Sequence, residues 1–408
     1  MKVVVAAVSS NRSLSGVSRH AANLAKCLLI RPEISALHVL VARWEEGCVK
    51  DAICRNDPRL HVHPVPMRPG TLARNLWYLQ TLPAIVQQLH ADVVHVSYPS
   101  LITASAFLCP TVATLHDLYP YDIPANFGLP KVFFNRMILR QCLRNAGAIA
   151  CVSEATRRRL CEVMPNVAEK AVTIGNFAES GPSPRKPAFA ASWNGEPFLL
   201  CVAQHRRNKN LLLALKVFRR ALAAGDVSQR TRLLVVGLAG PESGALYRFA
   251  RAENLDEAVV FVNGLSDAEL AWCYRNAELL LAPSLIEGFG LPVLEAQLAG
   301  CRVVCSDIPS FREVASPASR FVPLDSNAEE KFVVAVGEAL RARRPIPANM
   351  PRLSPSPIAK QYIELYGRVI ARRGRGEVAE VSLQRAPNQG SGETARPLSA
   401  RASNPLRP

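Results

Sequence analysis

The chain has 408 residues, of which 49% are hydrophobic, and it carries 49 basic against 33 acidic side chains, for a formal net charge of +16. That length suits two or three domains, and the composition allows a large core in each. No uninterrupted apolar segment reaches the roughly 18–20 residues that a membrane-spanning helix needs, so the sequence excludes a transmembrane protein, although a basic chain suits anionic partners.

The elements predicted along the chain alternate between short apolar strands and amphipathic helices. In the first half, strands are expected at Val3–Val8, Leu37–Val41, Val93–Val96, Val112–Leu115 and Ile149–Val152, with helices at Gly16–Leu29, Leu72–Leu89, Val132–Leu143 and Glu154–Val163. In the second half, strands are expected at Phe198–Ala203, Leu233–Val236, Val259–Val262, Leu279–Ala282 and Val303–Ser306, with helices at Asn210–Leu222, Ser243–Ala252, Asp267–Arg275 and Val293–Leu298. This alternation predicts an α/β chain with two doubly wound parallel sheets.

The domain boundaries follow from composition. Residues 179–195 are rich in Pro, Ser, Ala and Gly and are expected to be a linker between a first domain at 1–178 and a second at 196–353. A final helix is expected within residues 354–372, and the Arg-, Gly-, Ser- and Pro-rich residues 373–408 suggest a disordered basic tail.

Cysteine usage indicates the compartment. The eleven cysteines are scattered, include no C-x-x-C pair, and lie in several cases within apolar runs. They are expected to be buried free thiols in a cytoplasmic protein, because the cytoplasm keeps thiols reduced. The first apolar stretch is too short for a signal peptide and is expected to be a strand.

The most informative stretch runs from Glu287 to Glu295, with Gly288, Phe289, Gly290 and Leu291 between the two acids and Pro292 next. It follows an apolar strand, and Pro292 is expected to begin a helix, which would place Glu295 in the first turn. Glycines let a ligand approach the backbone, and the free amides and dipole of a helix start favour a bound anion. Either glutamate alone could be an ordinary loop or helix charge; the whole arrangement predicts a diphosphate held by amides with sugar hydroxyls on the carboxylates.

A second candidate is the cationic stretch from Gln204 to Asn210, which follows the first strand of the second domain. Cations at the carboxyl end of a strand can neutralise a leaving diphosphate. Lys209 is the preferred phosphate ligand, assisted by Arg206 or Arg207. A solvated run of charges is the alternative for this stretch taken alone.

Other candidates are single residues at strand ends. His116 follows a strand and precedes Asp117, so it is expected to project into the cleft, where it could contact the donor sugar. Gly16 and Gly264 lie in turns that could approach phosphates or a nucleotide base, or could be ordinary turns. No D-x-D sequence occurs, so a metal cofactor is not expected. His61 and His63 are expected to lie on a strand surface, not in a metal site.

These residues resemble the E-x7-E signature of retaining glycosyltransferases of the GT-B fold, the group 1 or family 4 type. The resemblance covers roughly residues 1–370 and extends to Asn208–Asn210, His116–Asp117 and Ile174–Asn176. It implies two Rossmann-like domains, a final helix that crosses back to the first domain, and transfer of a sugar from a nucleotide-sugar to a glycan or lipid-linked acceptor with retained anomeric configuration.

The resemblance also implies roles for the candidate residues. Glu287 would bind hydroxyls of the donor sugar, Glu295 the ribose, and Lys209 with Arg206 or Arg207 the diphosphate. His116 would contact the sugar near the anomeric carbon, and Gly16 would lie beside the phosphates. Two positions depart from the pattern: Gln204 stands where relatives often have an arginine, and Phe177 follows Asn176 where a glycine is usual. No residue is an evident covalent nucleophile.

Two other functions stay open from the sequence. The same fold could serve a phosphorylase or an epimerase. The charge and the basic tail could instead indicate a non-enzymatic protein on a membrane or nucleic acid, although nothing resembles a nucleic-acid-binding module. A segment with Lys131, Phe133 and Phe134 followed by arginines at 136, 140 and 144 predicts either peripheral contact with the anionic inner face of the membrane or a solvated helix face.

Overall fold

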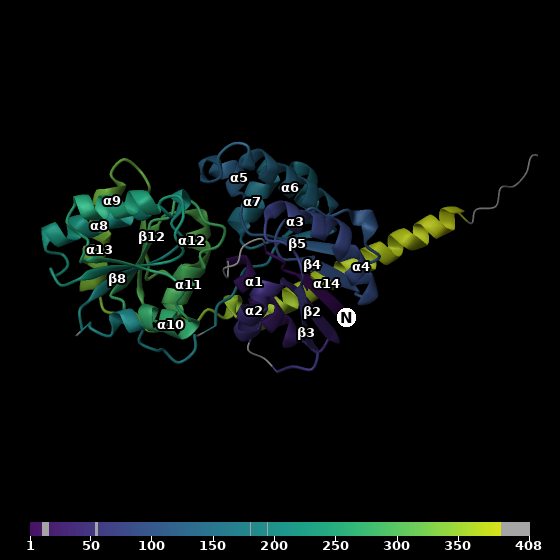
Figure 1. The fold of residues 1–408 in the computed structure, drawn as a ribbon, viewed down its shortest axis with the longest axis horizontal. Helices are drawn as coiled ribbons and strands as arrows, with labels where there is room; N and C mark the ends of the chain where they lie inside the picture. The colour runs from purple at the N-terminus through teal and green to yellow at the C-terminus, as the bar shows by residue number, and fades with distance from the viewer. Residues whose placement is uncertain (10–15, 54–55, 180, 194, 385–408) are drawn as a thin grey trace, which may run out of the picture.

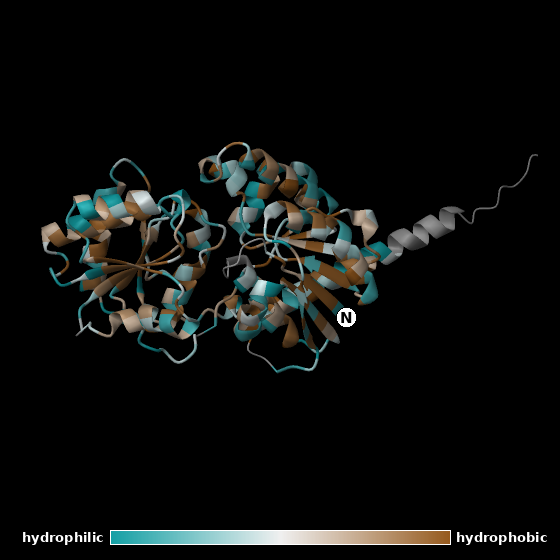
Figure 2. Ribbon diagram, viewed as in Figure 1, coloured by the Kyte–Doolittle hydropathy of each residue, from teal (hydrophilic) through white to brown (hydrophobic). Residues whose placement is uncertain are grey.

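The computed structural model describes residues 1–9, 16–53, 56–179, 181–193 and 195–384. They form two parallel sheets, each covered by helices, that lie side by side (Figure 1). The strands appear as brown, hydrophobic arrows inside each half, beneath helices of mixed polarity (Figure 2). The prediction of an α/β chain with two doubly wound parallel sheets is confirmed.

The first sheet has seven parallel strands in the order β3-β2-β1-β4-β5-β6-β7. The strands are β1 (Lys2–Ala6), β2 (Ala36–Ala42), β3 (Leu60–Val65), β4 (Val93–Val96), β5 (Thr111–Leu115), β6 (Ala148–Cys151) and β7 (Ala171–Thr173). The helices around it are α1 (Gly16–Leu29), α2 (Glu46–Ile53), α3 (Thr71–Leu76), α4 (Leu82–Gln88), α5 (Tyr119–Asp122), α6 (Lys131–Asn145) and α7 (Glu154–Val163).

The second sheet has six parallel strands in the order β10-β9-β8-β11-β12-β13. Its strands are β8 (Phe198–Val202), β9 (Arg232–Val236), β10 (Val259–Val262), β11 (Leu279–Ala282), β12 (Arg302–Ser306) and β13 (Arg320–Val322). Its helices are α8 (Leu211–Ala224), α9 (Ser243–Ala252), α10 (Asp267–Asn276), α11 (Leu291–Leu298), α12 (Pro309–Val314) and α13 (Ala328–Arg341).

Burial on both faces explains why the strands are continuous apolar runs. In β1, Val3 and Val5 pack in one core with α1 and α14 (Pro355–Gln384), whereas Val4 and Ala6 pack in another with Trp77 and its neighbours. Successive side chains of a strand point to opposite faces, so a strand between two helical layers has no polar face.

Both sheets reverse their strand order at one place, between β1 and β4 in the first and between β8 and β11 in the second. Open α/β sheets bind ligands at such switch points, beyond the carboxyl ends of the strands. The loops that follow these four strands are therefore the places where the fold itself positions a ligand.

Three expected elements differ in the structure. The single helix expected over residues 72–89 is divided into α3, a π-helical turn at Trp77–Thr81, and α4, which begins with Leu82 and Pro83. Proline removes a backbone donor and favours a helix start. Within the expected linker, Trp193 is 7% exposed and its ring packs against Phe198 of β8, so this part of the chain joins the core of the second sheet.

The final helix is longer than expected. α14 begins at Pro355 and continues to Gln384, so helix replaces part of the expected tail, and residues 385–408 lie outside the described residues. Its residues 358–369 enter the core of the first sheet, next to α1. Among the residues that the structure describes, each helix is too short or too polar to cross a bilayer.

Candidate active site between the two sheets

An ion pair stands at the switch point of the second sheet. Lys209 comes from the loop after β8 and Glu287 from the loop after β11, and Lys209 Nζ lies 2.6 Å from each carboxylate oxygen of Glu287. The side chains are 20% and 10% exposed, respectively. The two strongest candidates from the sequence are thus brought together, as a direct pair.

Local backbone geometry places Lys209. It ends a short 3₁₀ turn (Arg207–Lys209), and Asn210 then adopts a left-handed conformation with φ 50° before α8 begins. Asparagine tolerates this region better than most residues. The buried Asn208 ties the turn to the other loop, because its carbonyl oxygen accepts the Leu285 amide at 2.8 Å. The loops carrying Lys209 and Glu287 are therefore fixed to each other through their backbones.

Glu287 has further partners on both sides of the cleft. Ser284 Oγ donates to its Oε1 at 2.8 Å, and Tyr119 OH, from the first domain, donates to its Oε2 at 3.3 Å. A cavity of about 20 Å³ remains beside Lys209, Ser284 and Glu287. Little space is therefore left within the second domain beside this ion pair, and the charges of Lys209 and Glu287 balance one another.

Gly288 is a point of close contact between the two domains. A Cβ at this position would overlap the carbonyl oxygen of His116. The Gly288 carbonyl accepts hydrogen bonds from Ser153 Oγ at 2.6 Å and Thr156 Oγ1 at 3.1 Å, at the start of α7. This glycine therefore allows the β11–α11 loop to touch the first domain.

Two ionic contacts reinforce the same interface. The Glu313 carboxylate accepts the amides of Glu154 at 2.8 Å and Ala155 at 2.7 Å, which are free donors at the start of α7. Arg19 of α1 lies 2.8 Å from Asp267 of α10. Charged side chains therefore join the two domains at these two places.

His116 lies at the carboxyl end of β5. Its Nε2 donates to the Ser97 carbonyl at 2.8 Å, and its ring contacts His20 edge-on at 4.7 Å between centroids. Burial lowers the pKa of His116 to about 4, against the opposing effect of the Ser97 hydrogen bond. At neutral pH the ring is therefore neutral, with its Nδ1 deprotonated.

Asp117 points away from its neighbour and toward the second domain. Its Oδ1 accepts the Tyr119 amide at 3.1 Å. Burial raises the pKa of Asp117 to about 6, while the charges of Lys209 and Arg206 oppose that rise. Asp117 is not among the groups that shift the pKa of His116; its carboxylate is influenced by the cations of the second domain.

Glu295 corrects one expectation. α11 begins at Leu291 with Gly290 as its N-cap, so no acidic residue lies in its first turn. Tyr274 OH donates to Glu295 Oε2 at 2.7 Å. Burial raises the pKa of Glu295, and the Tyr274 hydrogen bond and the charge of Arg19 lower it. Its carboxylate is thus held by side chains beside the domain interface, not by the helix start.

The remaining predicted residues divide into scaffold and surface. Gly290 has φ 111°, and a Cβ there would approach Phe311 Cδ1 to 2.8 Å, so this position requires glycine. Phe289 is buried in the second core, Arg206 is half-buried and Arg207 is exposed. Leu291 opens α11, and Gly264, with φ 72°, follows β10 with open space beside it. Gly16 is the first residue of α1, and residues 10–15 before it lie outside the described residues.

One departure from the family pattern, Phe177 after Asn176, has a structural explanation. Asn176 Oδ1 accepts a hydrogen bond from His20 Nδ1 at 2.7 Å, and Phe177 is buried in the first core, so both residues anchor the chain where it leaves the first sheet.

Tyr119 is the contact that sequence reasoning missed. Nothing local marks it, because its partner Glu287 is 168 positions away.

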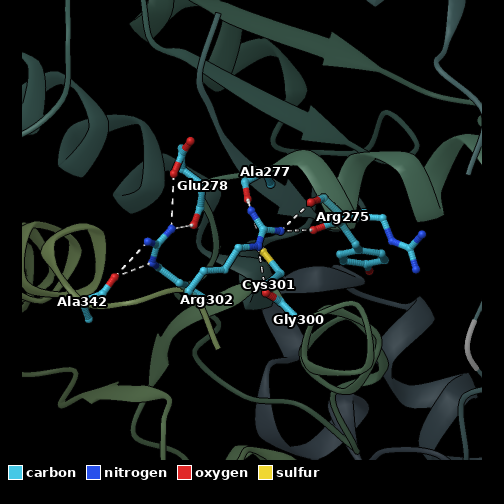
Figure 3. Close-up of polar contacts among 9 residues, drawn as sticks. Arg275, Ala277, Glu278, Gly300, Cys301, Arg302 and Ala342 are labelled. Carbon is cyan, nitrogen blue, oxygen red and sulfur yellow. Dashed lines mark hydrogen bonds and ion pairs between the residues drawn. The ribbon is translucent and has the colours of Figure 1, made fainter. Parts of the chain in front are cut away.

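A larger cavity lies elsewhere and has a structural explanation. It measures about 220 Å³ and lies where β12 and β13 begin, at the opposite edge of the second sheet, with Arg302 and Ala342 in its wall. The Arg302 guanidinium already bonds the Ala342 carbonyl at 2.9 Å and the Glu278 carbonyl at 3.2 Å, as the dashed lines of Figure 3 show. This arginine fixes the segment after α13 to the sheet and is not free for a ligand.

A metal site is not evident where the chain is described. Within those ranges, no group of three His, Cys, Asp or Glu side chains could hold a metal ion. The expectation of metal independence stays a prediction.

Comparisons with known proteins place the same two halves in one group of enzymes. A family model described as glycosyl transferases group 1 matches residues 184–350, and one described as glycosyltransferase family 4 matches residues 14–179. The O-antigen chain mannosyltransferase B of Escherichia coli is 24% identical over 338 residues, which are 78% of this chain and 85% of that protein.

Two further similarities extend this finding. The O-antigen chain mannosyltransferase RfbU of Salmonella typhimurium is 27% identical over 52% of this chain, and the match spans 56% of that protein's length. The crystal structure of Anabaena HepE in complex with UDP and glucose superposes with a TM-score of 0.61 at 15% identity, covering 90% of this chain and all of that one. At that identity the structural likeness shows the shared fold.

Proposed function

Because this chain belongs to the group 1 glycosyltransferases, we propose that it transfers mannose or a similar hexose from a nucleotide-diphosphate sugar to a glycan or lipid-linked acceptor. The proposal includes retention of anomeric configuration and an acceptor destined for polysaccharide or lipopolysaccharide. The names of the O-antigen mannosyltransferases support the sugar and the product class.

One observation carries the proposal: a lysine and a glutamate meet at 2.6 Å at the switch point of the second sheet. Bound diphosphate would take over the Lys209 ammonium and leave the Glu287 carboxylate free to accept sugar hydroxyls. Arg206, half-buried like Asp117, whose carboxylate feels its charge, would supply a second positive charge. The proximity of one cation and one acid matches a ligand with an anionic part next to a polyol.

The reaction needs little from side-chain nucleophiles. An acceptor hydroxyl would attack the anomeric carbon, the bond from that carbon to the β-phosphate oxygen would break, and the hydroxyl proton would pass to the departing phosphate. Lys209 would stabilise the negative charge that develops on the diphosphate. The interdomain contacts at Gly288 and Glu313 would exclude water and orient both substrates.

His116 would act as a neutral group. Its Nε2 proton is committed to Ser97, so the ring offers only Nδ1, an acceptor for a sugar hydroxyl. Its lowered pKa keeps a positive charge away from an anomeric carbon that becomes cationic in the transition state. A metal ion is not required in this account, because Lys209 and Arg206 take that electrostatic role.

Nucleotide-sugar screening tests the donor site. UDP-, GDP- and ADP-sugars would be compared by thermal shift on the wild type, Glu287→Gln and Lys209→Met, with the exposed Glu330→Gln as the matched control. We expect one nucleotide class to stabilise the wild type and the control, and to stabilise both site variants much less. Equal stabilisation of all four proteins would contradict the donor site.

The phosphorylase and epimerase alternatives make different products. With the stabilising donor and a glycan acceptor, the proposed enzyme releases nucleoside diphosphate and forms a new glycosidic bond. Phosphate-dependent cleavage of a glycan, or a change of sugar configuration without an acceptor, would favour one of the alternatives. Proton NMR of the new anomeric centre would test retention.

We also propose that α6 rests on an anionic membrane surface. Phe133 and Phe134 are 65% and 52% exposed, and Met137 is 44% exposed. The exposed Lys131, Arg140 and Arg144 lie on the same helix. Exposed aromatics beside cations are typical of helices that lie in the interface of a bilayer.

Vesicle flotation tests this surface. The wild type should float with vesicles containing phosphatidylglycerol at low salt, and Phe133→Ser/Phe134→Ser should not. Failure of the wild type to bind such vesicles at low salt would end the membrane proposal without affecting the donor site.

A further inference from the structure

The first sheet has a switch point of its own, and its residues are not used by the donor site. β1 and β4 are neighbours there, and the loop after β4 carries Ser97 and Tyr98. α3 is fastened to this loop, because Asn75 Oδ1 accepts the Leu101 amide at 3.1 Å. By the same rule that places the donor, a second ligand is expected at this edge.

Arg74 of α3 is the charged group at this edge. Its guanidinium carbon lies 4.6 Å from the centre of the Tyr98 ring. Its Nε is buried and has no hydrogen-bond partner in the part of the chain that the structure describes, and no carboxylate there lies within ion-pair distance of it. A stacked, half-buried arginine is held in place but has donors left for a ligand.

Two other half-buried arginines, Arg59 and Arg344, make different contacts. Arg59 bonds the carbonyls of Arg31 and Ile34, and Arg344 bonds those of Gly300 and Ala277. Those guanidinium groups are occupied by the protein. Arg74 differs because its position at the carboxyl edge of the sheet brings it to an aromatic ring instead of to backbone acceptors.

Glu45, whose charge acts on Tyr98, is already engaged. The Glu45 carboxylate accepts the Ser9 amide at 3.2 Å and Ser18 Oγ at 2.6 Å, and it is 1% exposed. The loop also touches the reacting centre, since the Ser97 carbonyl holds His116 Nε2 at 2.8 Å. Arg74 therefore presents positive charge one residue away from the group that positions His116.

We propose that Arg74 binds an oxyanion, a phosphate or a carboxylate, on the acceptor. This inference rests on the proposed function, since it assigns the acceptor to the remaining switch point of the same cleft. The planar guanidinium offers paired N–H donors that match the oxygen atoms of either anion. Stacking on Tyr98 holds these paired donors in one orientation. The acceptor is accordingly an anionic glycan or a phosphate-linked carrier, not a neutral sugar.

The test uses small anions that stand in for the acceptor. Sodium phosphate and sodium glucuronate would be titrated into Lys209→Met, whose donor site is disabled, and into Lys209→Met/Arg74→Gln, with sodium chloride at equal ionic strength as the reference. Melting temperature reports binding. We expect at least one anion to stabilise the first protein, and the apparent Kd to weaken about tenfold to a hundredfold on adding Arg74→Gln.

Controls separate this site from nonspecific charge and from misfolding. Arg251→Gln, an exposed arginine of α9, should leave the anion response unchanged. Arg74→Lys keeps the positive charge but lacks the paired N–H donors of the guanidinium, so it should bind the anion with intermediate affinity. Preference for phosphate over glucuronate would identify a phosphate-linked acceptor, and the reverse an acidic glycan. An anion response that is the same with and without Arg74, in proteins that melt normally without anion, would overturn the proposal.

The outcome is independent of the donor site. If nucleotide-sugars bind normally but Arg74→Gln changes nothing, only this inference fails. If Arg74 binds anions while Lys209→Met leaves nucleotide-sugar binding intact, the donor assignment fails instead.

Discussion

Single residues in the cleft are arranged so that opposite charges satisfy one another without a ligand. Lys209 contacts Glu287, and Asp117 faces Lys209 and Arg206 from the other domain. A diphosphate would replace carboxylates as the partner of these cations. On the proposed function, these carboxylates hold the cations in place until the diphosphate binds.

Asp117 makes the stability of the protein depend on pH. Its pKa of about 6 in the folded state exceeds the ordinary value near 4, so the folded protein binds more protons between these values, and stability decreases as the pH rises from about 4 to about 6. Asp117→Asn should raise the melting temperature at pH 7.5 and have little effect at pH 4. Equal shifts in melting temperature at both pH values would contradict a raised pKa of Asp117 in the folded protein.

Sequence reasoning identified some of these cleft residues and missed others. Lys209 and Glu287 stood out because each follows a strand in a recognisable local pattern. Tyr119 and Arg74 did not, because their roles depend on long-range placement: one meets an acid of the other domain, and the other is brought to Tyr98 by the packing of α3. Glu295 was placed in the wrong turn because α11 begins at Leu291, before the proline that was taken as its start.

At the scale of elements, the start of α7 forms hydrogen bonds that hold the two domains together. Ser153 caps the helix by accepting the Thr156 amide and donates to Gly288, while Glu313 accepts two further amides of the same turn. Capping contacts of this kind are worth roughly 0.5–2 kcal/mol. The helix start is thus satisfied by the partner domain as well as by its own cap.

Glu313→Ala should weaken these interdomain hydrogen bonds. We expect kcat/KM to fall about five- to thirtyfold, since a loss of roughly 1–2 kcal/mol in the closed state lowers its population. Each domain should keep its fold, because the lost bonds lie between them. Unchanged activity together with an unchanged radius of gyration in solution scattering would show that these hydrogen bonds have no part in closing the two domains.

The edge strand β3 and its neighbour β2 carry a second pH-sensitive group of residues. His38 Nδ1 lies 3.0 Å from His63 Nε2, and His61 stacks on His38 at 4.9 Å. Burial, followed by the neighbouring histidines, lowers the pKa of His38 to about 4. In the unfolded chain this histidine binds a proton near pH 6.5, so stability should be lost as the pH falls from about 6.5 to about 4.

Thermal melts across that pH range check the sign. His38→Gln should flatten the acid side of the profile, because it removes the group whose protonation opposes folding. A variant that melts with the same pH dependence as the wild type would place the acid sensitivity elsewhere.

Most elements were predictable because a strand buried on both faces leaves a short apolar run. α1, α7, β4, β10 and β11 have the expected bounds. The division of residues 72–89 into α3, a π turn and α4 was not predictable from periodicity, because the whole stretch has helical spacing. β7 and β13, of three residues each, are too short to leave a pattern.

For the whole molecule, Gly288 decides whether the domains can close. A Cβ there would overlap the His116 carbonyl oxygen. Gly288→Ala should therefore keep both domains folded but increase the radius of gyration and reduce turnover by at least about a hundredfold, because the site is completed only by both domains. Gly367→Ala, with no atom within 4 Å of the added methyl, is the matched control. A compact, active Gly288→Ala protein would contradict closure at this contact.

The central claim is that the Lys209–Glu287 pair marks where the activated sugar binds. A crystal structure with the stabilising nucleotide-sugar tests it most directly. The account predicts diphosphate oxygens within hydrogen-bond distance of Lys209 Nζ, the sugar hydroxyls on Glu287, and the nucleotide along the carboxyl edge of the second sheet. A diphosphate bound elsewhere, with the 2.6 Å ion pair undisturbed, would contradict it.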